Sequence, residues 1–284
     1  MRYLATVLLA TATTVALAGP SPAIPEPIVL PRPPFAYSYN GANGPVPTAR
    51  LVKIAEKPNR ITDVDRWFQT NNIQWPALDA DRLSSGDRGR LPPAVPLKFA
   101  GQRLIRAVIS PPLVVAIYGE DFAGGRYVVG YDPARQTFTF AFDFKNYIVP
   151  PAFAPADRDY VDESVQWVQF AGGVLYVSNF HRTYARSSKG LNGYITAIDL
   201  TKGTISWRSR PLVINANNFV VAGEVVIAGY GFTAEPDFLY LLNRANGTVI
   251  QTVPLRSGPE YLALRKDTLF VRTYNTDAVF RLAR

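Results

Sequence analysis

The sequence Asp199-Leu200-Thr201-Lys202-Gly203-Thr204 is one of three copies of a short phrase that decides the fold. The other copies run over 132–137 and 243–248, and each has Asp or Asn first, Gly or Gln fifth and Thr last. Each copy lies between two apolar runs, which predicts a turn that joins two β-strands. A turn of one design that recurs along a chain predicts a repeated structural unit.

A second apolar strand lies at a matching place in four copies of this unit. A tight turn and another β-rich stretch precede each of these strands, so the unit is predicted to be a four-stranded antiparallel meander. Each strand carries an aromatic residue at its sixth position. The strands are 113–119, 175–181, 225–231 and 269–275, and the aromatic residues are Tyr118, Phe180, Tyr230 and Tyr274.

Repeated meanders of this kind predict an all-β fold, a β-propeller with four recognisable four-stranded blades. A single meander cannot bury both of its faces, whereas meanders stacked around a channel can. A two-sheet sandwich also has many short strands, but it does not require them to repeat residue by residue. The poorly patterned segment 59–90 leaves room for a degenerate fifth blade.

The stretch from Gly193 to Trp207 resembles the repeat of quinoprotein-like (PQQ-repeat) propellers. In that repeat a Gly opens a strand ending in Ala-hydrophobic-Asp, a Thr-Lys-Gly turn follows, and a Trp comes shortly after; here these are Ala197-Ile198-Asp199, the turn at 201–203 and Trp207. The last copy, 258–284, resembles the surface-antigen type of propeller repeat. The resemblance implies a fold and no single activity. Quinone-dependent dehydrogenases of this kind typically have eight blades, a Trp-rich ring and a calcium-bound cofactor, whereas one copy here carries the Trp, so no cofactor is expected.

The fourth meander lacks its last strand, because the sequence runs out after the third. An unpaired strand edge invites aggregation, so a strand from the N-terminal side is expected to complete this blade. Segment 50–54 is favoured over 95–99, because Pro96 cannot donate a ladder hydrogen bond. The predicted domain of 49–284 is therefore one propeller, with its clear repeats in 100–284.

The first 18 residues predict export to the periplasm, the cell surface or the medium. Arg2, an apolar run and Ala16-Leu17-Ala18 before Gly19 form a secretory signal peptide with its cleavage site. The apolar run is too short for a membrane-spanning helix. Residues 19–48 are rich in proline, which predicts an extended spacer. The chain has no cysteine, so disulfides are excluded.

The chain has 30 Lys and Arg against 22 Asp and Glu, a formal net charge of +8. The positive residues are scattered along the sequence, without a dense basic run. For an exported protein this charge favours contact with anionic surfaces, such as lipid headgroups or wall polymers, over nucleic acid. The expected partner is a protein or an anionic envelope polymer.

The long predicted loops all fall on one face of the propeller, while the opposite face has tight turns. Function commonly sits on such loops, so we expect a site there. The loop 181–189 combines positive charge with an aromatic ring through His181, Arg182, Tyr184 and Arg186. These residues are candidates for gripping a carboxylate or phosphate, with an ordinary solvated loop as the alternative.

The aromatic residues at the strand ends allow two interpretations. Tyr118, Tyr230 and Tyr274 could ring the channel mouth and stack on a ligand, or they could pack between blades as repeated structural positions. The acidic segment 157–163 lacks the third alternating acid and the glycine of a calcium loop. It is expected to be a solvated loop, and no metal site is predicted.

The sequence offers few residues and motifs that are typical of catalysis. There is no cysteine nucleophile and no G-x-S-x-G motif, and one histidine cannot supply the clusters of zinc enzymes. The expected function is that of an exported, non-enzymatic propeller that binds its partner through the long-loop face. The alternative is a hydrolase or lyase acting on a carbohydrate or lactone, with acid and base drawn from Glu120, Asp121, Glu235 and Asp237.

Overall fold

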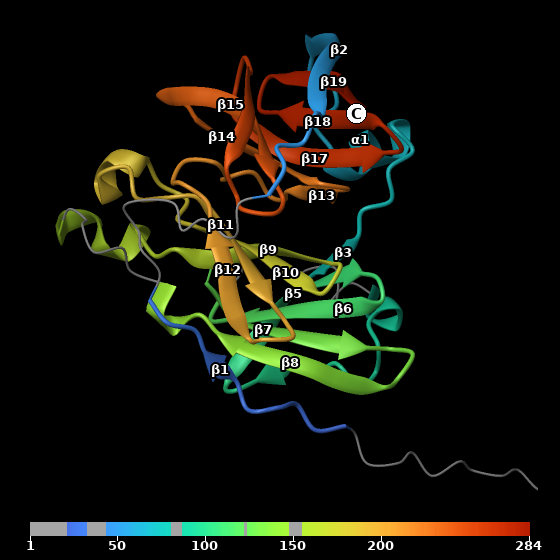
Figure 1. The fold of residues 1–284 in the computed structure, drawn as a ribbon, viewed down its shortest axis with the longest axis vertical. Helices are drawn as coiled ribbons and strands as arrows, with labels where there is room; N and C mark the ends of the chain where they lie inside the picture. Colours follow the sequence, from blue (N-terminus) through green and yellow to red (C-terminus); the bar gives the residue numbers. More distant parts are fainter. Residues whose placement is uncertain (1–21, 33–43, 81–86, 122–123, 148–154) are drawn as a thin grey trace, which may run out of the picture.

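The structure of the protein is a computed structural model that describes residues 22–32, 44–80, 87–121, 124–147 and 155–284 (Figure 1). The predicted signal peptide, 1–18, lies outside the described residues. Within the described ranges, no helix is long and apolar enough to cross a membrane.

The described chain is built almost entirely of β-strands, with one α-helix and four short 3-10 turns. The helix is α1 (Val64–Thr70). The strands are β1 (Ile28–Val29), β2 (Arg50–Pro58), β3 (Ala77–Asp79), β4 (Lys98–Phe99), β5 (Gln102–Ser110), β6 (Leu113–Gly119), β7 (Gly125–Asp132), β8 (Thr137–Asp143), β9 (Ser164–Ala171), β10 (Val174–Phe180), β11 (Tyr194–Asp199), β12 (Thr204–Arg208), β13 (Val220–Ala222), β14 (Val225–Phe232), β15 (Glu235–Asn243), β16 (Val249–Pro254), β17 (Pro259–Arg265), β18 (Thr268–Thr273) and β19 (Thr276–Ala283).

Consecutive strands pair antiparallel in groups of four, as the repeated meander predicts. β5 to β8 and β9 to β12 form two such groups, which a single bridge between Gly125 and Val165 joins into one larger sheet. β13 to β16 form a separate four-stranded sheet. The fourth group is β17, β18, β19 and β2, which we call the closing sheet. Figure 1 shows the groups side by side, with the closing sheet at the top.

The last position of the closing sheet is filled by β2, from the N-terminal side of the chain. Its ladder with β19 runs antiparallel from Arg50 opposite Ala283 to Pro58 opposite Thr276. Segment 50–54, which the sequence favours for this place, lies within this strand. The other candidate, 95–99, contributes β4, which pairs with β5 instead.

The recurrent six-residue phrase forms a turn held by its first side chain. Asp199 accepts hydrogen bonds through Oδ1 from the backbone N–H groups of Thr201, at 2.9 Å, and Lys202, at 3.1 Å. The fifth residue is left-handed in each copy, with φ of +65° at Gly203, +73° at Gly247 and +54° at Gln136. Glycine adopts this conformation without strain, which explains its recurrence at this position.

The four repeated aromatic residues divide into two kinds. Tyr118, Phe180 and Tyr230 are at most 3% exposed. Tyr274 is 74% exposed and follows the end of β18. The repeat therefore specifies a packing position in three units, and the fourth unit departs from it.

The proline-rich segment is packed where the sequence predicts a free spacer. β1 pairs in parallel with the outer edge of β8, and Leu30 is fully buried. The Asn146 side chain donates to the Leu30 carbonyl at 2.7 Å. The expectation of an extended spacer over 19–48 is therefore wrong for 28–30, because the apolar run Ile28-Val29-Leu30 can add a short strand and bury its last side chain. Residues 33–43 lie outside the described part of the chain.

The segment that left room for a fifth blade forms a central insertion. Its described residues make α1 and β3 and no four-stranded unit. Trp75 stacks on Phe68 at a ring distance of 4.9 Å and lies equally close to Trp167 of β9. Tyr261 of β17 meets both Phe68 and Trp75 edge-on. The insertion thus joins two of the four groups through aromatic contacts.

Candidate functional site

The first strands of the four groups, β5, β9, β13 and β17, meet at one place, and we call the line through it the axis. They line a single cavity of about 530 Å³ on the side of the tight turns, together with Trp75 of the insertion. Trp167 lines this cavity, and the guanidinium of Arg106 lies 5.5 Å from its ring. Arg106 in turn lines a hollow that opens among the long loops. The turn-side cavity and this hollow therefore lie on either side of the contact between Trp167 and Arg106.

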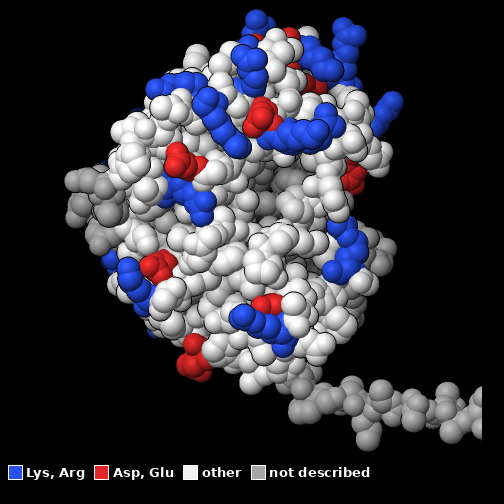
Figure 2. Space-filling model, turned by 45° about the vertical axis from the view of Figure 1, so that its right-hand side comes forward, with Lys and Arg blue, Asp and Glu red and all other residues white. Residues whose placement is uncertain are grey.

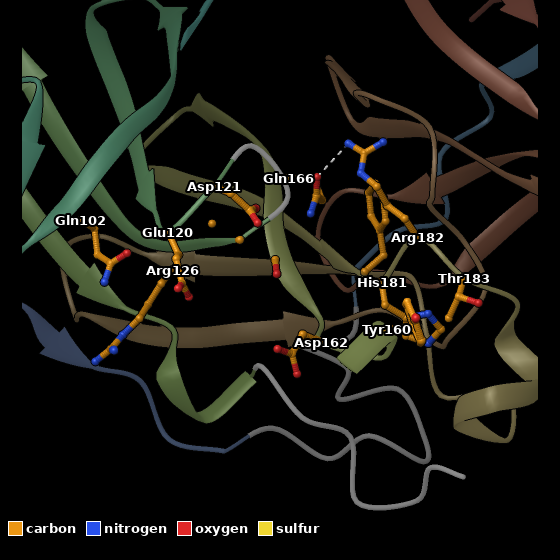
Figure 3. A pocket seen from close by; sticks show the side chains of 14 residues that line it. Gln102, Glu120, Asp121, Arg126, Tyr160, Asp162, Gln166, His181, Arg182 and Thr183 are labelled. Carbon is orange, nitrogen blue, oxygen red and sulfur yellow. Dashed lines mark hydrogen bonds between the residues drawn. The ribbon is translucent and has the colours of Figure 1, made fainter. Parts of the chain in front are cut away.

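Arg182 occupies the middle of the long-loop side. It lines three adjoining hollows of about 420, 410 and 390 Å³. Its Nη2 donates to Oε1 of Gln166 at 3.0 Å, and its guanidinium lies 5.8 Å from the ring of Phe180 (Figure 3). Within the described part of the chain, no carboxylate forms an ion pair with Arg182.

Two other cations near the axis, Arg106 and Arg272, already have carboxylate partners. Arg106 forms an ion pair with Asp79 and donates to the Gln166 carbonyl at 2.8 Å. Arg272 pairs with Glu260 at 3.3 Å. Burial, and then the positive charge of Arg106, lower the pKa of Arg182. Because a guanidinium starts from so high a pKa, Arg182 stays charged and unneutralised.

His181 lines the hollow beside Arg182, but its ring is almost fully buried and is held by the loop itself. It is 2% exposed, its backbone N–H donates to Oδ1 of Asn192 at 2.9 Å, and its Nε2 lies 2.7 Å from Oγ of Ser188. Burial lowers the pKa of His181 to about 4, so the imidazole is neutral at pH 7. The histidine therefore fixes the loop that carries Arg182.

The other two candidate residues of this loop lie in a different hollow. Tyr184 and Arg186 line a peripheral hollow of about 600 Å³ with Asp157 and Glu235. The ring of Tyr184 packs edge-on against Phe232 at 4.5 Å. The loop 181–189 thus presents its positive charges in two separate hollows, of which only one lies at the axis.

The candidate tyrosines differ in what their hydroxyls and rings can reach. The Tyr118 hydroxyl donates to the Pro96 carbonyl at 3.0 Å, and the Tyr230 hydroxyl bonds to Glu235. Both side chains are buried. Tyr274 presents its ring to solvent and lines the same hollow as Arg182 and Asp237. A ligand at the axis can therefore reach Tyr274 without a rearrangement.

The four candidate acids are divided among three hollows. Glu120 and Asp121 line one beside Arg182, across from it in Figure 3, and Asp237 lines a second. Glu235 lines the peripheral hollow, where it already accepts hydrogen bonds from Tyr230 and from the Ala185 backbone N–H. Among the described residues, no group of three His, Cys, Asp or Glu side chains could hold a metal ion.

The acidic segment 157–163 ends in a buried ion pair that the sequence does not predict. Glu163 and Arg208 are both fully buried, with Nη2 and Oε2 3.0 Å apart. The guanidinium lies over the rings of Tyr194, at 3.9 Å, and Tyr147, at 5.0 Å. Burial raises the pKa of Glu163, and the positive charge and hydrogen bond of Arg208 oppose this effect. The expectation of a solvated loop is therefore wrong for Glu163.

Comparison with known proteins gives a likeness of fold alone. No family model and no curated protein matches the sequence. Among solved structures, the computationally designed Ika4 protein is 12% identical, with a TM-score of 0.39 over 61% of this chain and 88% of its own. BamB from Moraxella catarrhalis is 11% identical, with a TM-score of 0.32 over 62% of this chain and 71% of its own.

A europium-containing methanol dehydrogenase is 14% identical, with a TM-score of 0.35 over 57% of this chain and 26% of its own. The likeness of this chain to these three structures is weak, at TM-scores below 0.4. At these identities it extends to no activity, ligand or partner.

Proposed function

We propose that the protein is a four-bladed β-propeller, closed by β2, that acts as an exported, non-enzymatic scaffold and binds a protein or an anionic surface polymer through its long-loop face. Its blades are the three consecutive meanders and the closing sheet. The pairing of β2 with β19 and the cavity lined by all four first strands support this arrangement. The predicted signal peptide supports export.

The proposed binding site is the hollow around Arg182, and the partner presents an anionic group to it. The carrying observation is that Arg182 stands at the axis with one side-chain hydrogen bond, to Gln166, and no carboxylate partner among the described residues. A guanidinium offers five N–H donors in a planar fork, which suits the two oxygens of a carboxylate or phosphate. A protein side chain, a chain end or an anionic polymer can supply such a group.

The structure gives less support to a hydrolase or lyase. General acid and base catalysis requires two groups within hydrogen-bond reach of one reacting bond. Glu235 is engaged by Tyr230, and Asp237 lines a different hollow from Glu120 and Asp121. Of the four acids proposed for this chemistry, only the sequence neighbours Glu120 and Asp121 line the same hollow.

Replacing Arg182 tests the proposal. We expect Arg182→Gln to weaken binding of poly-glutamate and polyphosphate by about tenfold or more, since hydrogen bonds to charged groups contribute about 1.5–3 kcal/mol. Titration calorimetry of both probes measures the loss. Arg135→Gln is the matched control, because Arg135 is 80% exposed in a tight turn and removes the same charge. Equal losses from both variants would place binding elsewhere.

A further inference from the structure

The positive charge of the protein is concentrated in the closing sheet. The segments 50–60 and 256–284 contain ten Lys and Arg against four Asp and Glu, so they hold +6 of the formal net charge of +8. Figure 2 shows the basic side chains crowded at the top of the molecule, where Figure 1 places the closing sheet. Charge that is scattered in the sequence is thus gathered on one blade by the fold.

The cations of this sheet face solvent, and most of its acids do not. Nine of the ten are exposed: Arg50, Lys53, Lys57, Arg60, Arg256, Arg265, Lys266, Arg281 and Arg284. Among the acids, Asp277 is 8% exposed, and the Glu56 side chain is 11% exposed beneath Lys53 and Arg256. The Glu260 carboxylate is paired with buried Arg272. The exposed side chains of the closing sheet therefore carry a more positive charge than the composition of the two segments suggests.

Two exposed apolar side chains lie among these cations. Val52 is 42% exposed and Ile54 is 60% exposed, and both belong to β2, the outermost strand of the closing sheet. The two side chains flank Lys53, at the β-bulge that shifts the register of β2 against β19 between Lys53 and Ala55. In sequence they are interleaved with Arg50, Lys53 and Lys57.

We propose that the outer surface of the closing sheet, formed by β2 and β19, binds the surface of an anionic lipid bilayer. The cations supply attraction to acidic headgroups, and Val52 and Ile54 supply the apolar contact that reaches below them. A soluble polyanion would leave these two side chains in water, which is why the lipid surface is the better match. This contact lies on the side of the molecule, apart from Arg182 at the axis, and does not depend on the function proposed for that residue.

Sedimentation with vesicles tests this surface. We expect the protein to bind vesicles of phosphatidylglycerol mixed with phosphatidylcholine, to release with rising salt, and to ignore pure phosphatidylcholine. In Lys57→Gln/Arg281→Gln, each lost cation should weaken partitioning about fivefold. The control Arg135→Gln/Lys202→Gln removes two cations whose side chains are 80% and 75% exposed in other turns, and it should change partitioning little.

The apolar contact separates a bilayer from a soluble polyanion. We expect Ile54→Ser to weaken vesicle binding while leaving binding of soluble polyphosphate unchanged, and Ile54→Leu to keep both. Thermal melting of each variant confirms that the fold is retained. Equal losses in the two charge variants, or vesicle binding that Ile54→Ser leaves intact, would overturn the proposal.

Discussion

At the scale of single residues, His181 makes stability depend on pH. Its pKa is about 4 in the folded protein and about 6.5 when exposed, so the unfolded chain binds the proton more tightly. The stability present above about pH 6.5 is therefore lost as the pH falls toward 4, by up to about 3 kcal/mol. The variant His181→Gln can still form a hydrogen bond to Ser188. We expect its melting temperature to decrease less than that of the parent protein when the pH is lowered from about 7.5 to about 4.5. Parallel losses would show that other groups cause the acid sensitivity.

The pair Glu163–Arg208 is a second residue-scale determinant of stability. Removing one member strands the other charge in a fully buried place. We expect Arg208→Met to lower the free energy of unfolding by about 3–5 kcal/mol, and Arg208→Met/Glu163→Gln to recover part of that loss. Urea unfolding monitored by tryptophan fluorescence measures both. A double variant as unstable as Arg208→Met alone would mean that packing, and not the stranded carboxylate, carries the cost.

At the scale of elements, β2 is expected to stabilise the closing sheet through its inward side chains. Leu51 is 4% exposed, and its backbone N–H and carbonyl are bonded to the Gln251 side chain at 2.7 and 3.1 Å. Its neighbour Val52 is 42% exposed. We expect Leu51→Ala to cost about 2–5 kcal/mol of unfolding free energy and Val52→Ala about 0.5 kcal/mol or less. Similar costs from these adjacent residues in chemical denaturation would contradict the inward packing of β2.

The elements also show how far the sequence can predict this structure. The recurrent turns were predictable because their bonds are local: Asp199 reaches residues two and three places ahead. The burial of Leu30 and the pair Glu163–Arg208 were not, because each depends on segments that meet only after folding. The candidate loop was recognisable from its composition, but only the assembled groups show that Arg182 stands at the axis while Arg186 points to the periphery.

At the scale of the whole molecule, the two proposed contacts occupy different directions. Arg182 lines a hollow among the long loops. The basic strands β2 and β19 form the outer side of the closing sheet. A protein resting on a bilayer through that side would keep its axial hollow open to a second partner.

The ladder between β2 and β19 has a consequence for biosynthesis. Arg50 and its partner Ala283 belong to one sheet, yet they lie far apart in this sequence. The ribosome therefore translates Arg50 long before Ala283. β2 must therefore wait, with Leu51 uncovered, until every other strand described here has been translated. During that interval the nascent protein carries a positively charged strand with an unpaired edge. It would depend on a chaperone or on rapid release to avoid pairing with a neighbouring copy.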